Sequence, residues 1–383
     1  MKKIFYWSPC LNKVGTYRST INSALSISKY SNNNFSVKII NACGEWDDKK
    51  ELFEKNNIEI INLGLNFFKF LPKIGYINSR LSNIIIFIMS FFFLARLLKK
   101  EKPDYLIAHL ITSLPLTLMN LLNLKTRFIL RISGFPRLNI LRKLFWKFCA
   151  KKIFRVTCPS KELKKQLIKL NFIDESKLIF LPDPIIHLKE FVDNLRISRN
   201  RLSKLNKREY FISAGRLTKQ KNFEYLIDEF NLFSKKNKDI DLYIFGEGEK
   251  KNFLLKKIND YGLSERVFLK GYSDDIYFHM KNSKAFILSS LWEDPGFVII
   301  EAALCNLFVI SSDCKNGPEE FLHRGKAGIL FKNNIKNALF NSLIEFLNSN
   351  EKLNEMKILA KKNSSQYTLF RHYGILKSIL GSN

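Results

Sequence analysis

The segment SSLWEDPGFVIIEAA, residues 289–303, decides how the second half of the chain folds. Ala285 to Ser290 is short and apolar, which predicts a buried strand. Pro295 and Gly296 predict a turn, and Phe297 to Leu304 predicts the start of a helix. A strand, a loop and a helix in this order are typical of an open parallel α/β sheet.

Two carboxylates, Glu293 and Glu301, fall on the loop and on the helix of this segment. In an open parallel sheet such a loop lies at the carboxyl edge of the strands, where ligands bind, and the helix N-terminus offers N–H groups to an anion. Carboxylates about two helical turns apart can accept hydrogen bonds from hydroxyls on either side of a bound phosphate. Sugar nucleotides have this layout. Since carboxylates are common on surfaces, two solvated side chains are the alternative.

A second loop has the composition of a phosphate site. Tyr210 to Ala214 predicts a strand, Gly215 frees the backbone at its end, and Arg216 and Lys221 bracket the loop before a helix that Asn222 could cap. A guanidinium, an ammonium and a helix N-terminus together match a diphosphate. The alternative is that both cations are ordinary members of the 63 Lys and Arg residues.

Residues 289–303 resemble the signature of glycosyltransferase family 4, in which seven residues separate two Glu and Gly-Phe follows the first. Further motifs of that family occur in its order at residues 213–223, 245–248, 269–272, 309–321 and 325–331. The resemblance implies a GT-B fold: two Rossmann-like, doubly wound parallel-sheet α/β domains that face each other across a cleft. It also implies transfer of a sugar from a nucleotide donor.

Length and composition suit two domains. The chain has 383 residues, and 46% hydrophobic residues exclude general disorder. We expect an acceptor-binding domain at residues 1–190 and a nucleotide-sugar-binding domain at 191–365, with a polar connection between Pro184 and Arg208. The family's last helix crosses back onto the first domain, and residues 366–383 resemble it.

Alternating apolar runs and amphipathic stretches place the strands. In the first sheet they are expected near Lys2–Trp7, Phe35–Asn41, Ile58–Leu63, Asp104–His109, Lys125–Leu130, Ile153–Thr157 and Lys177–Leu181. The second sheet is expected to run through Tyr210, Leu242, Val267, Ala285, Leu307 and Gly328.

The resemblance assigns roles to the second-half residues one by one. Arg216 and Lys221 would stabilise the departing diphosphate, in place of a metal ion. Glu293 would hold hydroxyls of the donor sugar, and Glu301 the ribose. The implied donor-binding residues are Gly15, Gly215, Gly246, Tyr272, Gly296, Phe297 and Glu301. Neither a cofactor nor a metal is expected, and the anomeric configuration would be retained.

The first half departs most from the family. In its first loop Val14 replaces one glycine of the family's pair, so close approach to the donor phosphate is expected only at Gly15. His109 matches a His that contacts the donor sugar at the catalytic centre of many members; a core histidine is the alternative. Arg131, at another strand end, is a candidate acceptor contact.

The net charge is +28. Such an excess attracts anionic surfaces, so phospholipid headgroups, a lipid pyrophosphate acceptor and nucleic acid are physically suitable partners. A compositional origin is the alternative, because Lys, Asn, Ile and Phe are abundant throughout, as AT-biased coding produces. No repeat, RNA-stacking signature or zinc motif favours nucleic acid.

The strongest apolar run, Ile84 to Ala95, has basic flanks. Its 12 residues are fewer than the ~20 needed to span a bilayer. A buried helix is favoured over one that lies in the membrane interface.

Six cysteines, at positions 10, 43, 149, 158, 305 and 314, show no metal-ligand spacing, and the start of the chain has too short an apolar core for a secretory signal. A reduced, cytoplasmic setting is the simplest account. The resemblance to family 4 implies a transferase that adds a hexose or N-acetylhexosamine from a nucleotide sugar, preferably a UDP-sugar, to a growing, lipid-linked surface glycan. We expect it to act peripherally at the inner face of the cytoplasmic membrane. The alternative is a nucleic-acid-binding or scaffold protein on a degenerate transferase fold.

Overall fold

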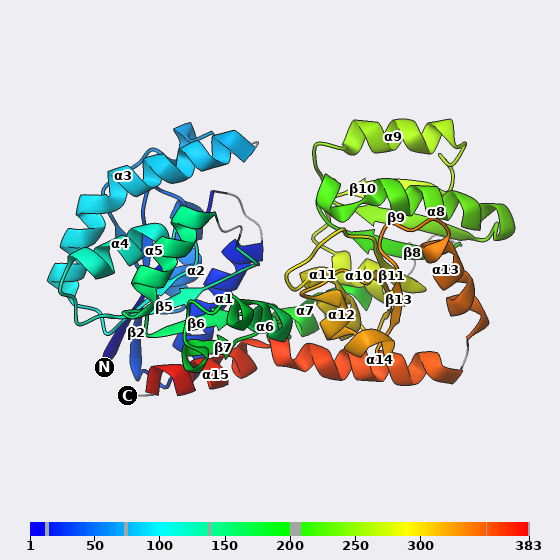
Figure 1. Ribbon diagram of the computed structural model, residues 1–383. Helices are drawn as coiled ribbons and strands as arrows, with labels where there is room; N and C mark the ends of the chain where they lie inside the picture. The colour runs from blue at the N-terminus through cyan, green and yellow to red at the C-terminus, as the bar shows by residue number, and fades with distance from the viewer. Residues whose placement is uncertain (12–14, 73–75, 137–138, 200–207, 350, 382–383) are drawn as a thin grey trace. The chain divides into compact units, whose positions relative to one another are not determined.

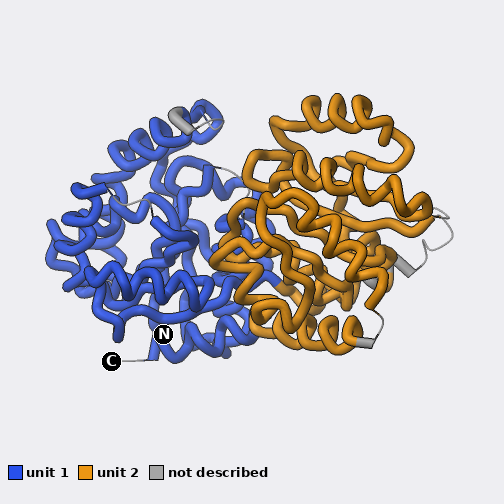
Figure 2. The backbone as a smooth tube through the Cα atoms, turned by 45° about the vertical axis from the view of Figure 1, so that its right-hand side comes forward, with its two compact units in different colours: residues 1–185, 369–383 blue, residues 186–368 orange. Residues whose placement is uncertain are grey.

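The computed structural model describes residues 1–11, 15–72, 76–136, 139–199, 208–349 and 351–381. The chain divides into two compact units, drawn in different colours in Figure 2. Unit 1 comprises Met1–Ile185 and Leu369–Asn383, and unit 2 comprises Ile186–Thr368.

Unit 1 is built on a seven-stranded parallel sheet with the order β3-β2-β1-β4-β5-β6-β7. The strands are β1 (Lys2–Trp7), β2 (Phe35–Asn41), β3 (Glu59–Asn62), β4 (Tyr105–Ala108), β5 (Arg127–Arg131), β6 (Arg155–Cys158) and β7 (Leu178–Phe180). The strand order reverses between β1 and β4, which defines a doubly wound sheet.

The helices of unit 1 are α1 (Gly15–Tyr30), α2 (Lys50–Lys55), α3 (Tyr76–Glu101), α4 (Ser113–Leu121), α5 (Ile140–Ala150), α6 (Lys161–Lys169) and α15 (Leu369–Gly381). Crossovers between parallel strands are right-handed, so α3, α4, α5 and α6 belong to one face of the sheet and α1 and α2 to the other. α15 joins the face of α1, against which it packs.

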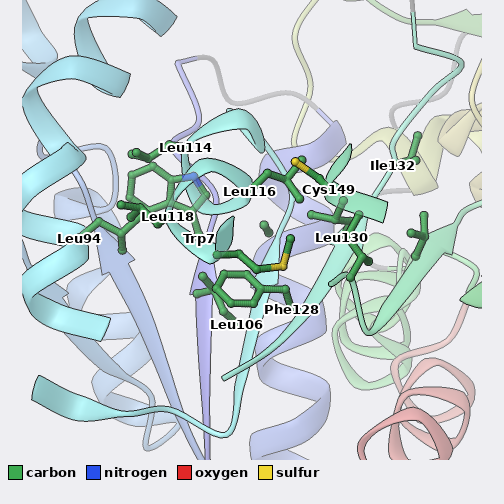
Figure 3. Close-up of a cluster of buried hydrophobic side chains, with 14 of the residues drawn as sticks. Trp7, Leu94, Leu106, Leu114, Leu116, Leu118, Phe128, Leu130, Ile132 and Cys149 are labelled. Carbon is green, nitrogen blue, oxygen red and sulfur yellow. The ribbon is translucent and has the colours of Figure 1, made fainter. Parts of the chain in front are cut away.

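Both faces of the first sheet are buried, as the alternation along β1 shows. Phe5 and Trp7 belong to the core under α3 and α4, whereas Ile4 and Tyr6 belong to the core under α1 and α15. Figure 3 shows the first of these cores, with Leu94 of α3 beside Trp7. A parallel strand covered on both sides is apolar throughout, which is how the sequence of β1 reads.

Unit 2 contains a six-stranded parallel sheet with the order β10-β9-β8-β11-β12-β13. Its strands are β8 (Glu209–Ala214), β9 (Ile240–Phe245), β10 (Val267–Gly271), β11 (Ala285–Leu288), β12 (Phe308–Ser312) and β13 (Ile329–Phe331). Here the order reverses between β8 and β11.

The helices of unit 2 are α7 (Leu188–Arg199), α8 (Phe223–Lys236), α9 (Lys251–Asp260), α10 (Ile276–Lys281), α11 (Phe297–Leu304), α12 (Pro318–Phe321), α13 (Ala338–Asn348) and α14 (Glu351–Ser364). They lie on both sides of the second sheet, with α8 and α9 away from α11 and α12 (Figure 1). The predicted fold class, two doubly wound parallel-sheet domains, is confirmed.

Two segments differ from their predictions. The units divide between Ile185 and Ile186, inside the stretch expected as an interdomain connection, but that stretch also contains α7. The apolar run at Ile84 to Ala95 is the middle of the 26-residue α3, because the residues on both sides are helical too.

α3 is also less buried than expected. In the described part of the chain, its stretch Asn78–Glu101 is the one helical segment long and apolar enough to cross a membrane, and 28% of that segment's most apolar window is buried.

Candidate active site

The reversal of strand order in unit 2 brings two loops together. The loop after β8 carries Lys221, and the loop after β11 carries Glu293. The backbone N–H of Leu291 donates to Gln220 O at 2.8 Å, and Ser289 Oγ donates to Lys221 O at 2.8 Å. The two loops are therefore joined at the topological switch point, where ligands bind in open α/β sheets.

Lys221 and Glu293 form an ion pair at this point. Lys221 Nζ lies 2.5 Å from Glu293 Oε1, and Ser290 Oγ donates to the same oxygen at 2.5 Å. The Lys221 side chain is 13% exposed and that of Glu293 7%. The ion pair allows the Glu293 carboxylate to be buried, because a buried charge requires a partner.

Glycines let these loops pack closely. A Cβ on Gly215 would lie 2.9 Å from Lys221 Cε, so the lysine stem lies directly over the glycine. A Cβ on Gly246 would lie 1.9 Å from Gly215 O, which no side chain could accommodate. The structure thus gives Gly246 a packing role beneath the loop after β8.

The remaining residues of that loop are placed as follows. Arg216 is exposed. Lys219–Lys221 form a short 3-10 helix, and Asn222 follows it in the left-handed conformation. The side-chain cap predicted at Asn222 does not form, because the left-handed backbone of Asn222 directs its side chain away from the N–H groups of α8. The side-chain amide of Asn222 donates to Asn334 Oδ1 at 3.4 Å instead.

Residues 285–303 fold as strand, loop and helix: β11 ends at Leu288 and α11 begins at Phe297. Gly296 precedes α11 with φ +86°, a conformation that favours glycine, and Phe297 is the first residue of the helix. Glu301 is buried in α11, where its Oε1 accepts a hydrogen bond from Tyr277 Oη at 3.2 Å. Tyr272 follows β10, and its side chain is exposed.

Sequence reasoning missed Ser290 and Tyr277, which hold the two carboxylates. Ser290 stands three residues before Glu293 at the end of a strand, a position from which a hydroxyl can reach back to the loop. Tyr277 lies on α10, 24 residues from Glu301, and no local pattern connects them.

In unit 1, His109 follows β4 and is buried. Its Nδ1 lies 3.2 Å from Thr20 Oγ1, and the single hydroxyl hydrogen of Thr20 goes to Thr16 O at 2.9 Å. Thr20 therefore accepts from Nδ1–H, which leaves Nε2 as the acceptor nitrogen of the ring. Burial, then the nearby Arg131, hold the pKa of His109 well below its ordinary value, so the imidazole is neutral.

Arg131 is buried at the end of β5. Its guanidinium donates to Leu181 O at 2.7 Å and to the Asp183 carboxylate, which also accepts from Ser19. This arrangement does not suit the predicted acceptor contact, because the buried guanidinium is already engaged. It fixes the chain after β7 to β5 instead.

Gly15 is the first residue of α1 and is exposed. Val14, where the sequence departs from the family's glycine pair, lies outside the described residues. The six cysteines are all buried, and none of them forms a disulfide. Within the described ranges no group of three or more His, Cys, Asp or Glu side chains could hold a metal ion.

Comparisons with known proteins agree with this geometry. Residues 196–363 match the family model of glycosyl transferases group 1. Unit 2 is a group 1 glycosyltransferase domain. The match leaves the first 195 residues outside it, and these include most of unit 1.

Two curated relatives match part of the chain. An uncharacterized glycosyltransferase of Methanocaldococcus jannaschii is 37% identical over 132 residues, which are 31% of this chain and 32% of the relative. The N-acetylgalactosamine-N,N'-diacetylbacillosaminyl-diphospho-undecaprenol 4-alpha-N-acetylgalactosaminyltransferase of Campylobacter jejuni is 30% identical over 129 residues, or 34% of this chain and 35% of the relative. The matched part thus spans about a third of each relative's length.

A solved structure matches the whole chain. HepE of Anabaena, crystallised in complex with UDP and glucose, superposes with a TM-score of 0.75 over 100% of both chains at 15% identity. At this identity the likeness shows the fold, which is GT-B.

Proposed function

We propose that the protein is a retaining glycosyltransferase of family 4 that moves a hexose or N-acetylhexosamine from a nucleotide sugar, preferably a UDP-sugar, to a growing, lipid-linked surface glycan. The observation that carries the proposal is the Lys221–Glu293 pair at the switch point of a group 1 glycosyltransferase domain. The UDP in HepE and the diphospho-undecaprenol in the name of the Campylobacter relative support the choice of donor and acceptor.

The departing diphosphate would be stabilised by cations of the chain itself. Lys221 lies at the switch point and Arg216 is exposed on the same loop. A fixed ammonium and a guanidinium favour a developing negative charge because they need little reorganisation as it forms. No metal ion is required for this step.

Glu293 would exchange part of its contact with Lys221 for hydroxyls of the donor sugar, while Ser290 holds the carboxylate in place. Glu301 would accept hydrogen bonds from the ribose. The N–H groups of Gly296 and Phe297, at the start of α11, would orient sugar or phosphate oxygens.

His109 would contact the donor sugar as a neutral imidazole, with Nε2 accepting from a hydroxyl. No residue is proposed as a covalent nucleophile. The leaving phosphate would take the acceptor's proton as the new glycosidic bond forms on the same face of the sugar. Unit 1 would bind the acceptor, and the protein would act at the inner face of the cytoplasmic membrane as a peripheral protein.

Saturation-transfer NMR against a panel of nucleotide sugars tests the donor. We expect contacts to the uracil, ribose and sugar protons of one or more UDP-sugars, and their loss in Glu301→Gln. Glu265→Gln is the matched control, since Glu265 is exposed just before β10, at the amino end of the sheet. If no nucleotide sugar binds, but the protein retards RNA or DNA on a native gel in a salt-dependent manner, the protein is a nucleic-acid-binding protein on a transferase fold.

A further inference from the structure

α3 is apolar on nearly all sides, and its fully buried residues form one stripe, flanked by half-buried residues that pack against the same core. Its buried residues recur every fourth position, at Ser82, Ile86, Ser90, Leu94 and Leu98. This stripe packs on the first sheet, in the core shown in Figure 3. A helix this apolar is normally enclosed by protein or lipid on its other sides as well.

The uncovered side of α3 carries large apolar side chains. Phe92 is 77% exposed, and Ile88 and Ile84 lie one and two turns before it on the same face. Met89 and Phe93 extend this face around the helix. Exposed apolar groups gathered in this way mark an interaction site.

α5 has the same character. Ile140 is 77% exposed, and Leu141, Leu144 and Phe148 are exposed along the same helix, whereas Trp146 and Cys149 face the core. Both sides of α5 therefore carry apolar side chains, whereas a helix on the surface of a globular domain normally presents polar residues outward.

The topology places the two helices in one layer. α3, α4 and α5 are three consecutive crossover helices, which connect β3 to β4, β4 to β5 and β5 to β6 in one direction across the sheet. α4 contacts both α3 and α5. Figure 1 shows the three helices together over the sheet of unit 1. We call their exposed apolar side chains the α3–α5 surface: Leu81, Ile84, Ile88, Met89, Phe92, Phe93, Leu121, Ile140, Leu141, Leu144 and Phe148.

The charge around this surface has one sign. Between Ile60 and Lys161 the sequence contains two acidic residues, Glu101 and Asp104. Exposed basic residues, by contrast, border or interrupt the apolar groups at Arg80, Arg96, Lys99, Lys100, Arg142, Lys143, Lys147, Lys151 and Lys152.

We propose that the α3–α5 surface is the membrane-docking face of the protein, with α3 and α5 lying in the interface of an anionic bilayer. Apolar side chains enter the boundary between headgroups and acyl chains, while Lys and Arg reach anionic headgroups. A second copy of the chain is a poor occupant, since two such faces would bring like charges together. The inference locates the membrane contact of the proposed function.

Lying in the interface suits α3 better than spanning the membrane. Its Leu94 and Leu98 are buried in the core of unit 1, and the chain continues from its end into β4 at the centre of the sheet. Insertion across a bilayer would withdraw this stripe from the core, whereas interfacial binding leaves it in place.

Co-sedimentation with vesicles tests the inference on the full chain, without donor or acceptor. We expect binding to vesicles of phosphatidylglycerol and phosphatidylcholine in equal parts, release by salt, and little binding to phosphatidylcholine alone. Ile88→Ser with Phe92→Ser on α3, and Leu141→Ser with Phe148→Ser on α5, should each weaken binding about tenfold or more.

The matched control is Phe253→Ser with Leu255→Ser on α9, another helix with exposed apolar and basic side chains, in unit 2. This variant should bind vesicles like the wild type. Lys143→Glu with Lys147→Glu gives a second test, because both side chains are exposed and their replacement leaves the core intact. It should weaken binding to anionic vesicles and leave the thermal midpoint unchanged.

Absence of vesicle binding at low salt, equal binding to neutral vesicles, or unchanged binding of the α3 and α5 variants would overturn the inference. Self-association that the same variants abolish, without vesicle binding, would assign the surface to a second copy instead. Donor binding, measured by NMR, separates this inference from the proposed function. Vesicle binding without donor binding would support the membrane-docking face and contradict the proposed transferase activity.

Discussion

Lys221 Nζ lies 2.5 Å from Glu293 Oε1, although 72 residues separate them in the sequence. The two residues stand on the loops after β8 and β11, which are neighbours only because the strand order reverses there. The topology of unit 2 therefore creates the pair, and the pair marks the place where a phosphate and a sugar hydroxyl would be bound side by side.

Replacing either member of the pair should abolish transfer. Glu293→Gln keeps an oxygen that accepts from Ser290, and Lys221→Met keeps the stem that covers Gly215, so both variants should fold. Turnover should fall about 100-fold or more, since each removes a charged contact to the transition state. The measurements are the rate of release of the nucleotide product and the thermal midpoint of each variant. Near-normal turnover in either variant would contradict the assignment of Lys221 and Glu293 to the active site.

The alanine variant of Lys221 makes a useful contrast. Both lysine variants leave the buried carboxylate of Glu293 without its ion-pair partner, and Lys221→Ala also removes the stem that covers Gly215. The unpaired carboxylate should lower the free energy of unfolding by about 1 to 3 kcal/mol in both variants, and the missing stem should lower it further in the alanine variant. Comparison of the two thermal midpoints therefore separates the loss of the charge from the loss of packing.

Transfer should persist in excess EDTA. In the proposed reaction Arg216 and Lys221 would supply the positive charge that other transferases take from a divalent cation. Initial rates with and without chelator are the measurement, after dialysis to remove bound metal. Complete loss of activity that only Mg²⁺ or Mn²⁺ restores would show that the reaction depends on a metal ion.

The strands and the loop carrying Lys221 could be predicted because their signals are local. β1 and β2 have the predicted bounds, since buried parallel strands are continuous apolar runs between turns. Arg131 could not be placed correctly: a strand end predicts an accessible side chain, but Asp183, 52 residues away, holds its guanidinium inside unit 1. Contacts between residues far apart in the sequence depend on tertiary packing, and local sequence patterns do not predict them.

The exposure of α3 was hidden from the sequence for a similar reason. An apolar run predicts burial, but the area of sheet available to cover it depends on how many helices share that face. Four crossovers occupy this face of the first sheet, and among the described residues of α3 only the stripe ending at Leu98 is fully buried. Burial of one stripe was predictable, whereas the exposed remainder followed from the fold.

Gly246→Ala should damage the loop after β8. A Cβ there would lie 1.9 Å from Gly215 O, so the loop under Lys221 must move. We expect a loss of about 2 kcal/mol or more in the free energy of unfolding, together with weaker donor binding. Gly374→Ala is the control, because nothing lies within 4 Å of its Cβ and alanine favours a helix. Equal thermal midpoints for the two variants would contradict the close packing.

His372 should make the stability of unit 1 depend on pH. It is buried on α15, where Nε2 lies 2.8 Å from Ser23 Oγ and Nδ1 lies 2.8 Å from Pro182 O, and burial lowers its pKa to about 4. A histidine in the unfolded chain has a pKa near 6.5, so between about pH 6.5 and 4 the unfolded state binds more protons. The stabilisation is therefore complete above pH 6.5 and is lost as the pH falls toward 4, by up to about 3 kcal/mol.

Chemical denaturation at several pH values between 7.5 and 5 measures this loss, and His372→Gln provides the comparison. Glutamine keeps a donor and an acceptor near Ser23 but cannot take up a proton in this range. The variant should be less stable than the wild type at pH 7.5, because the contact to Pro182 O is lost, and its free energy of unfolding should decline less steeply toward pH 5. His109 and His279, whose pKa values are also lowered by burial, contribute to the slope that remains. Parallel pH profiles for the two proteins would mean that His372 does not titrate on unfolding and that the buried contact of α15 with α1 is not formed as described.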